Sequence, residues 1–165
     1  MSSLEFLSSS RCLPETLASP LARALAGVGS DVVRDLSADG KVEIRGDLDL
    51  VEPRDGEQLV RLTPRRGLLL VDGDPVEAVE RLRALGLRAY DLSGGLAGLA
   101  IEGEQLLRRL TDLDLDTLPA AGGFARIGAI LVRDEGERFR VYFPQELGHY
   151  VAEVVLDAIA GLENS

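Results

Sequence analysis

The chain is short of the side chains on which most metal and redox sites are built. Its 165 residues include one cysteine, Cys12, one histidine, His149, and no tryptophan. A single cysteine excludes an intramolecular disulfide, and the two residues together cannot supply the four Cys or His ligands of a structural zinc site. Catalysis of the Ser-His-Asp or Cys-His type would rest on His149 alone. We interpret Cys12 as an ordinary small side chain.

Positive charge and long hydrophobic runs are also scarce. Lys and Arg number 18 against 28 Asp and Glu, which gives a net charge of −10. That balance argues against binding to nucleic acid and to an anionic membrane surface. The longest apolar runs, such as 67–71, are too short to span a bilayer. Residues 1–10 lack the basic start and apolar core of a signal peptide, so we expect a cytoplasmic protein.

What the chain does contain is typical of a folded domain. Hydrophobic residues make up 45% of it and charged residues 28%, and this length can bury the core of one domain. Residues 1–30 are rich in Ser, Ala and Leu and are interrupted by Pro14 and Pro20. We expect a loosely held amino-terminal arm there, with a short helix over 20–26. Residues 31–165 are predicted to form a single α+β domain.

Alternating and continuous apolar patterns predict strands in the first half of the chain. Half-buried strands alternate charged and apolar residues, whereas fully buried strands are continuous apolar runs. Asp-Gly and Gly-Asp pairs, which favour turns, bound the first of these segments. The predicted strands are 41–45, 58–63, 67–71 and 87–92.

A helix over 75–86 is predicted between the last two of these strands. Asp74 is a favourable cap, Pro75 suits the first helical position, and Gly86 suits the end of the helix. Its apolar face consists of Val76, Val79, Leu82 and Leu85. The run 67–92 is therefore a strand-helix-strand crossover with two parallel strands, which either pair directly or are separated by a third strand.

The second half of the chain repeats this order of elements. The predicted strands are 97–101, 125–132 and 138–143, and the predicted helices are 104–111 and about 145–160. The last helix carries a continuous apolar stripe with no strand alternative. The stripe consists of Leu147, Val151, Val154, Val155, Ala158, Ile159 and Leu162. Two such units predict an α+β fold of split β-α-β, ferredoxin-like units, with a mostly antiparallel sheet and helices on one face.

The most specific pattern lies in residues 87–118. A strand ends in Asp91-Leu92-Ser93, and a Gly94-Gly95 turn, a second strand and a helix opened by Glu102-Gly103 follow. This order resembles the amino-terminal domain of the aminomethyltransferase superfamily, whose members include folate-binding T-proteins. Within the superfamily it is most similar to the gamma subunit of heterotetrameric sarcosine oxidase.

Shorter matches extend the resemblance over most of the chain. They are Ser19-Pro20-Leu21-Ala22, the strand Val42-Glu43-Ile44-Arg45-Gly46-Asp47, and an "LxxLTxxDL" helix exit from Leu107 to Leu115. The sequence departs from the gamma-subunit pattern at two places. Only residues 47–59 are available where the family has a longer segment with a helix, and Pro144-Gln145 replaces the Arg-Ser pair that opens the last helix.

The resemblance implies a non-catalytic, gamma-type subunit of a heteromeric sarcosine oxidase-like flavoenzyme. The complex would demethylate sarcosine oxidatively and transfer the one-carbon unit to tetrahydrofolate. Tetrahydrofolate, FAD, FMN and NAD are then expected on partner subunits and none on this chain, and the expected partner is the large flavoprotein alpha subunit. The alternative is a stand-alone small folate-binding or aminomethyltransferase-like protein of one-carbon metabolism.

The candidate sites are consistent with a non-catalytic chain. Folate-binding members of the superfamily carry an acidic residue near the strand that corresponds to 125–132, where this chain has no carboxylate. The glycine stretches 91–98 and 120–123 precede predicted strands rather than helices, which argues against a nucleotide site. We therefore predict no catalytic, cofactor-binding or metal-binding residue.

The sequence leaves two interpretations open for the aspartates at 112–116 and two for His149. Asp112, Asp114 and Asp116 form either a cation site with oxygen ligands or the solvated side of a half-exposed edge strand, and their alternation with leucines favours the strand. His149, next to Tyr150, is either an exposed helix residue or a polar contact at a subunit interface.

Overall fold

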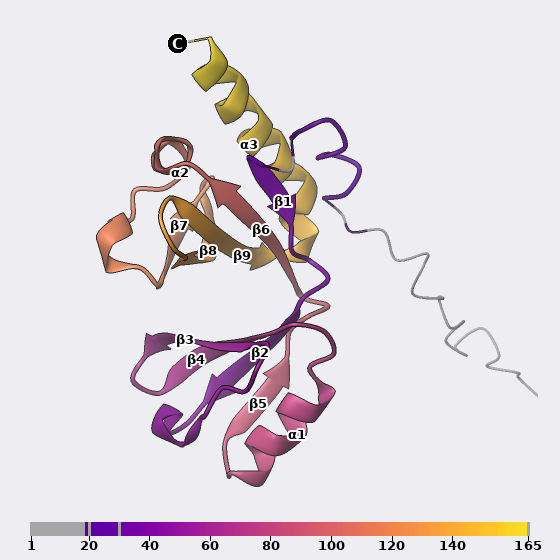
Figure 1. Cartoon of the computed structure of the whole chain (residues 1–165), viewed down its shortest axis with the longest axis vertical. Helices are drawn as coiled ribbons and strands as arrows, with labels where there is room; N and C mark the ends of the chain where they lie inside the picture. The colour runs from indigo at the N-terminus through magenta and orange to yellow at the C-terminus, as the bar shows by residue number, and fades with distance from the viewer. Residues whose placement is uncertain (1–18, 20, 30, 165) are drawn as a thin grey trace, which may run out of the picture.

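The computed structural model describes residues 19, 21–29 and 31–164, which form two antiparallel sheets and three α-helices (Figure 1). Sheet A has the strand order β1-β6-β9-β8-β7, and sheet B has the order β3-β4-β2-β5. The strands are β1 (Val33–Asp35), β2 (Gly40–Arg45), β3 (Glu57–Thr63), β4 (Arg66–Val71), β5 (Arg88–Asp91), β6 (Leu96–Glu102), β7 (Ala120–Phe124), β8 (Ile127–Arg133) and β9 (Arg138–Pro144). The helices are α1 (Val76–Ala84), α2 (Glu104–Leu110) and α3 (Gly148–Glu163), with short 3-10 helices η3 (Leu48–Leu50), η4 (Leu115–Thr117) and η5 (Gln145–Leu147).

Sheet B contains the predicted crossover. β2 pairs antiparallel with both β4 and β5, so β4 and β5 are parallel and β2 is the third strand between them. Helix α1 begins after Asp74, whose Oδ1 accepts the N–H of Val76 at 3.0 Å. It covers the outer face of the sheet with Ala78, Val79 and Leu82. The predicted apolar face was wrong at its two ends: Val76, the first residue of α1, and Leu85, which follows its last residue, are 55% and 46% exposed.

Sheet A contains the second unit. β9 pairs antiparallel with β6 and β8, which are therefore parallel to each other and separated by β9. Helices α2 and α3 contact each other and cover the outer face of this sheet (Figure 1). The predicted stripe of the last helix is confirmed: Val151 and Val155 are fully buried, and its other members pack against the same core.

The two sheets lie one above the other in Figure 1 and share an apolar layer. Its buried members are Val60, Leu68, Leu70, Val132 and Tyr142. The α+β fold of mostly antiparallel strands is confirmed, but the strands form two sheets rather than one. The helices consequently lie on the outer faces of two sheets, and the order of layers is helices, sheet A, sheet B and helix.

Lys41 connects the two segments at which the chain crosses between the sheets. Its side chain is fully buried, and Nζ donates to the carbonyls of Ser37 and Asp39 at 2.9 and 2.6 Å. Its backbone N–H donates to the Ser93 hydroxyl at 2.9 Å, and its carbonyl accepts the N–H of Leu92. Burial lowers the pKa of Lys41, and Asp39 opposes that effect. The Asp91-Leu92-Ser93 pattern thus has an architectural role, since it fixes the second crossing against the first.

The amino-terminal segment differs from the prediction where it is described. Residues 21–27 form consecutive turns instead of the predicted helix. Leu21 is fully buried in the core of sheet A, and Ala24 and Leu25 pack against the same core. Residues 1–18 of the predicted arm, with Cys12, lie outside the described residues, so the division at residue 30 stays a prediction.

The ion pair between Glu57 of β3 and Arg81 of α1 yields a stability prediction. Nη2 of Arg81 donates to both carboxylate oxygens at 2.7 and 2.6 Å, and the two side chains are 9% and 18% exposed. Burial alone would raise the pKa of Glu57, but hydrogen bonds from Arg81 and from the N–H of Arg54 lower it. A lowered folded-state pKa means that the carboxylate stabilises the fold above its unfolded pKa. The stabilisation is lost as the pH falls through the folded value.

Glu57→Gln is therefore expected to reduce the free energy of unfolding by about 1–3 kcal/mol at neutral pH. The difference from the parent should shrink below about pH 4.3, where the unfolded chain binds the proton too. Urea unfolding at pH 7 and at low pH measures both effects. The control is Glu77→Gln, because the Glu77–Arg54 pair is exposed (81% and 57%) and such pairs contribute about 0–1 kcal/mol. Equal losses in the two variants would contradict the assignment.

Candidate functional site

The turn between β7 and β8 is the most strained backbone in the described part of the chain. Ala125 and Arg126 both have positive φ, 48° and 66°, a combination that hairpins normally reserve for Asn-Gly. Two contacts hold it: the Ala125 N–H donates to the Leu110 carbonyl at 2.7 Å, and the Tyr150 hydroxyl donates to the Ala125 carbonyl at 2.9 Å. Such positions cost about 1–3 kcal/mol each and occur preferentially at functional sites.

A cavity of about 540 Å³ lies against this turn, between the end of α2 and the start of α3. Its volume is in the range of small-molecule sites. Its polar lining comprises Arg109, Thr111, Asp112, Arg126 and Tyr150. These groups supply charge and hydrogen bonds, but no imidazole, thiol or pair of carboxylates that could exchange protons with a substrate. The arrangement is therefore suited to binding rather than to acid-base chemistry.

The position of this turn corrects one prediction. Residues 125–132 were predicted to be one strand, but β8 begins at Ile127, and Ala125 and Arg126 form the turn that joins it to β7. Strand β7 was missed because Ala120-Ala121-Gly122-Gly123 has little strand propensity. Tyr150, noted in the sequence only as the neighbour of His149, is the side chain that reaches the turn.

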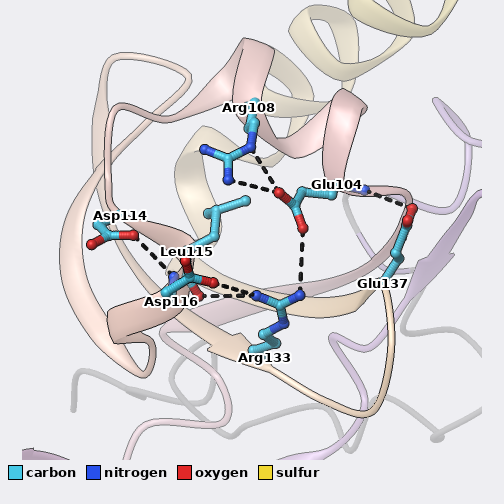
Figure 2. Close-up of polar contacts among 7 residues, drawn as sticks. All are labelled: Glu104, Arg108, Asp114, Leu115, Asp116, Arg133 and Glu137. Carbon is cyan, nitrogen blue, oxygen red and sulfur yellow. Dashed lines mark hydrogen bonds and ion pairs between the residues drawn. The ribbon is translucent and has the colours of Figure 1, made fainter.

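Asp116, the last member of the acidic series, belongs to an ion-pair network around Arg133 of β8 (Figure 2). Nη1 of Arg133 lies 3.2 Å from Oδ1 of Asp116, and its Nη2 lies 3.4 Å from Oε2 of Glu104. The guanidinium also lies over the Phe139 ring, 5.4 Å from its centre. Asp114 accepts the N–H of Asp116 and caps η4. The three aspartates are exposed, as the solvated interpretation predicts. The predicted edge strand over 112–116 is wrong, because Leu115–Thr117 form the capped 3-10 helix η4.

Glu104 ties the network to helix α2. Its Oε1 accepts from Arg108, one turn along the helix, at 2.7 Å, and its backbone N–H donates to Glu137 at 3.3 Å (Figure 2). Each carboxylate in contact with Arg133 therefore already neutralises a cation. Among the described residues, no group of three or more His, Cys, Asp or Glu side chains is placed to hold a metal ion.

His149 has the exposed setting that one interpretation predicts. Its side chain is 78% exposed on α3, and Nε2 lies 3.2 Å from Oε1 of Glu153. Glu153 is its one ion-pair partner among the described residues and is itself 62% exposed, so the pair lies on the open surface of the helix. The interface alternative stays a prediction.

Sequence reasoning missed a polar group that lies between the sheets. Arg140 of β9 donates Nε and Nη2 to Asp134 at 2.9 and 2.6 Å, and Nη2 also to Gln58 of β3 in the other sheet. Burial alone would lower the pKa of Arg140, but the hydrogen bond to Asp134 raises it. Burial raises the pKa of the adjacent Tyr142 hydroxyl. The only signal in the sequence is a lone arginine inside the apolar run 139–143.

Comparison with known proteins relates this fold to a multi-subunit enzyme. The sequence matches no protein-family model and no curated protein. The structure is similar to a chain of the heterotetrameric sarcosine oxidase from Corynebacterium sp. U-96, solved in complex with pyrrole 2-carboxylate, with a TM-score of 0.74. The match covers 87% of this chain and 95% of that chain at 17% identity. The two chains share a fold over nearly their whole lengths.

A second solved structure is too distant to inform the fold. Aspartokinase III from E. coli, in complex with lysine and aspartate, has a TM-score of 0.42 and 12% identity, and the match covers 74% of this chain and 31% of that one. Separately, none of the helices in the described residues combines the length and apolar character needed to cross a bilayer.

Proposed function

We propose that this chain is a non-catalytic, gamma-type subunit of a sarcosine oxidase-like flavoenzyme. The observation that carries the proposal is the shared fold with a chain of heterotetrameric sarcosine oxidase, which extends over 87% of this chain and 95% of that one. The motif order of residues 87–118 supports the same assignment.

The chemistry of the complex is assigned to its partner subunits. In this proposal FAD, FMN, NAD and tetrahydrofolate are bound by the larger partner subunits. The whole complex demethylates sarcosine oxidatively and transfers the one-carbon unit to tetrahydrofolate. The present chain packs against the alpha subunit and completes the assembly. Its described polar clusters support this role, because Arg133 and Arg140 serve internal ion pairs rather than an open reaction centre.

Co-purification from the native host tests the assembly. A tagged copy of the full chain is expected to bring down a large flavoprotein in fixed stoichiometry, identified by mass spectrometry and by its flavin spectrum. Recovery of the chain alone, under conditions that preserve known heterotetramers, would exclude the proposal.

The isolated chain is expected to lack the visible absorbance of a bound flavin. It is also expected not to oxidise sarcosine. The physical reason is that its sequence has no dinucleotide fingerprint and one histidine and one cysteine only. Absorbance spectroscopy and an oxygen-uptake assay of the purified chain measure both properties. A tightly bound yellow cofactor would contradict the prediction.

Deleting residues 1–18 is expected to weaken assembly with the flavoprotein subunit while leaving the domain folded. Leu4, Phe6, Leu7, Leu13 and Leu17 are apolar residues among Ser and Pro. Such a segment packs either on its own domain or on a neighbouring subunit, and in the second case its burial stabilises the complex. Leu21, the buried contact with sheet A, is retained in the truncated chain. Unchanged assembly after the deletion, measured by analytical ultracentrifugation, would remove the arm from the proposed interface.

A stand-alone small folate-binding protein is the second candidate, and the cavity beside Ala125 and Arg126 is the feature that favours it. The expectation remains weak or no binding, because residues 125–132 lack the carboxylate of the folate-binding proteins. Isothermal calorimetry with tetrahydrofolate decides between the candidates. Micromolar affinity in the isolated chain would favour the second.

A further inference from the structure

Three arginines lie side by side across one end of sheet B. Arg45 of β2 is directly opposite Arg88 of β5 in one ladder and directly opposite Arg66 of β4 in the other. Directly opposed residues of antiparallel strands project from the same face of a sheet, and like charges in such positions destabilise it. A fourth, Arg65, lies in the adjacent β3–β4 turn, where its carbonyl accepts the N–H of Gly46 at 3.0 Å.

Among the residues that the structure describes, Glu43 is the one carboxylate that forms ion pairs with these arginines. Glu43 has its side chain 11% exposed, and its Oε1 accepts from Arg45 at 3.1 Å and from Arg66 at 2.7 Å. Among the described residues, no ion pair joins the side chain of Arg65 or Arg88 to a carboxylate. The nearby Asp47 accepts the N–H of Asp49 at the start of η3. Glu43 therefore pairs with two of the four arginines, and Arg65 and Arg88 keep uncompensated charges in a chain whose net charge is −10.

A hollow of about 360 Å³ lies among these side chains, lined by Arg45, Arg65, Arg88 and two glycines. Gly46 and Gly86 have φ of 142° and 80°, a backbone conformation that favours glycine, so these two turns add backbone without side chains to the wall of the hollow. The volume suits a small ligand. Planar guanidinium groups bind carboxylates and phosphates through paired hydrogen bonds.

We propose that this hollow is a binding site for a small polyanion, held by Arg45, Arg65 and Arg88. A ligand with two or more negative charges removes the repulsion that the opposed arginines otherwise impose. The remaining surface selects for a small ligand, because the net charge of −10 repels extended polyanions such as nucleic acid. The site lies in sheet B, away from the β7–β8 turn, and it does not depend on the proposed subunit role.

Calorimetry on the full chain tests the site, with pyrophosphate and citrate as the two probes. At low salt the parent should bind at least one probe with a dissociation constant below about 1 mM. The double variant Arg65→Gln/Arg88→Gln should weaken that binding at least about tenfold. It should remain folded with an unchanged or higher Tm, because both side chains are exposed and their mutual repulsion is removed. Tighter binding of pyrophosphate assigns a phosphoryl ligand, and tighter binding of citrate assigns a carboxylate ligand.

Two further variants separate a built site from general attraction. Arg138→Gln removes one charge from an exposed arginine of β9 in sheet A and should leave the affinity within about twofold. Arg88→Lys keeps the charge but loses the planar fork, so it should bind more weakly than the parent and more tightly than Arg88→Gln. The proposal is overturned if neither probe binds at about 10 mM, or if Arg138→Gln weakens binding as much as Arg88→Gln does.

Discussion

Val155→Asp should leave the chain largely unfolded. The Val155 side chain is fully buried in the core between α3 and sheet A. Among the described residues the one buried cation is Lys41, which lies at the crossing between the sheets. An unpaired buried carboxylate costs about 3–5 kcal/mol, which is a large share of the 5–15 kcal/mol of a typical domain (order of magnitude). Far-UV circular dichroism during urea unfolding should show a midpoint shifted to low denaturant, or no folded baseline.

The matched control is Ala160→Asp, which places the same carboxylate on the exposed side of the same helix. Surface substitutions of this kind usually change stability by about 0.5 kcal/mol or less. If the two variants lost the same stability, the effect would belong to helix propensity and not to burial. The interpretation of α3 as a core helix would then be wrong.

Helix α3 also shows which part of the fold is local enough to be predicted. Its apolar residues recur at the helical period over four turns, and any strand would place half of them in water. The same argument predicted α2, whose Leu106, Leu107 and Leu110 are buried as expected. Strong periodicity within one element therefore identified both the element and its buried face.

The arrangement of strands depends on pairings between distant residues, which no local pattern encodes. The position of β2 between β4 and β5 could be kept only as one of two alternatives, because the apolar pattern of a strand does not name its neighbours. Strand β1 has three residues, too few for a period to be recognised. The chain crosses between the two sheets at Lys41 and Ser93. The crossing could not be predicted from the sequence, because it buries a lysine and charged side chains usually lie at the surface.

The candidate sites also depend on contacts between distant residues that the sequence pattern does not encode. Arg65 and Arg66 are neighbours in the sequence, but Arg45 and Arg88 join them only through the register of β2. The β7–β8 turn was hidden because Ala125-Arg126 lacks the Asn-Gly or Asp-Gly signal of such turns. Both features conflict with local preference, which is where sequence reasoning is expected to fail and where functional sites concentrate.

Tyr142→Ala is expected to reduce the free energy of unfolding by about 3–5 kcal/mol, the range for truncating a large aromatic core residue. Tyr142 is 1% exposed and lies in the apolar layer shared by the two sheets. Its ring lies against Gly98, where an added Cβ would be 3.0 Å from the ring. Removing the ring leaves a cavity that neither sheet can fill, because each is held by its own ladder. Urea unfolding measures the loss, and hydrogen exchange should show reduced protection in β4 as well as in β9.

Tyr142→Phe is the control, because it keeps the ring and removes only the hydroxyl, which lies 3.5 Å from Nη1 of Arg140. A hydrogen bond that long contributes little, so the loss should be about 1 kcal/mol or less. Arg140 keeps its bidentate contact with Asp134 in both variants. A loss in Tyr142→Phe as large as in Tyr142→Ala would place the stabilisation in the polar group instead of the apolar layer. If the Tyr142 ring joins the two sheets, removing it must destabilise both of them. Reduced protection in β9 alone would therefore mean that the sheets unfold independently.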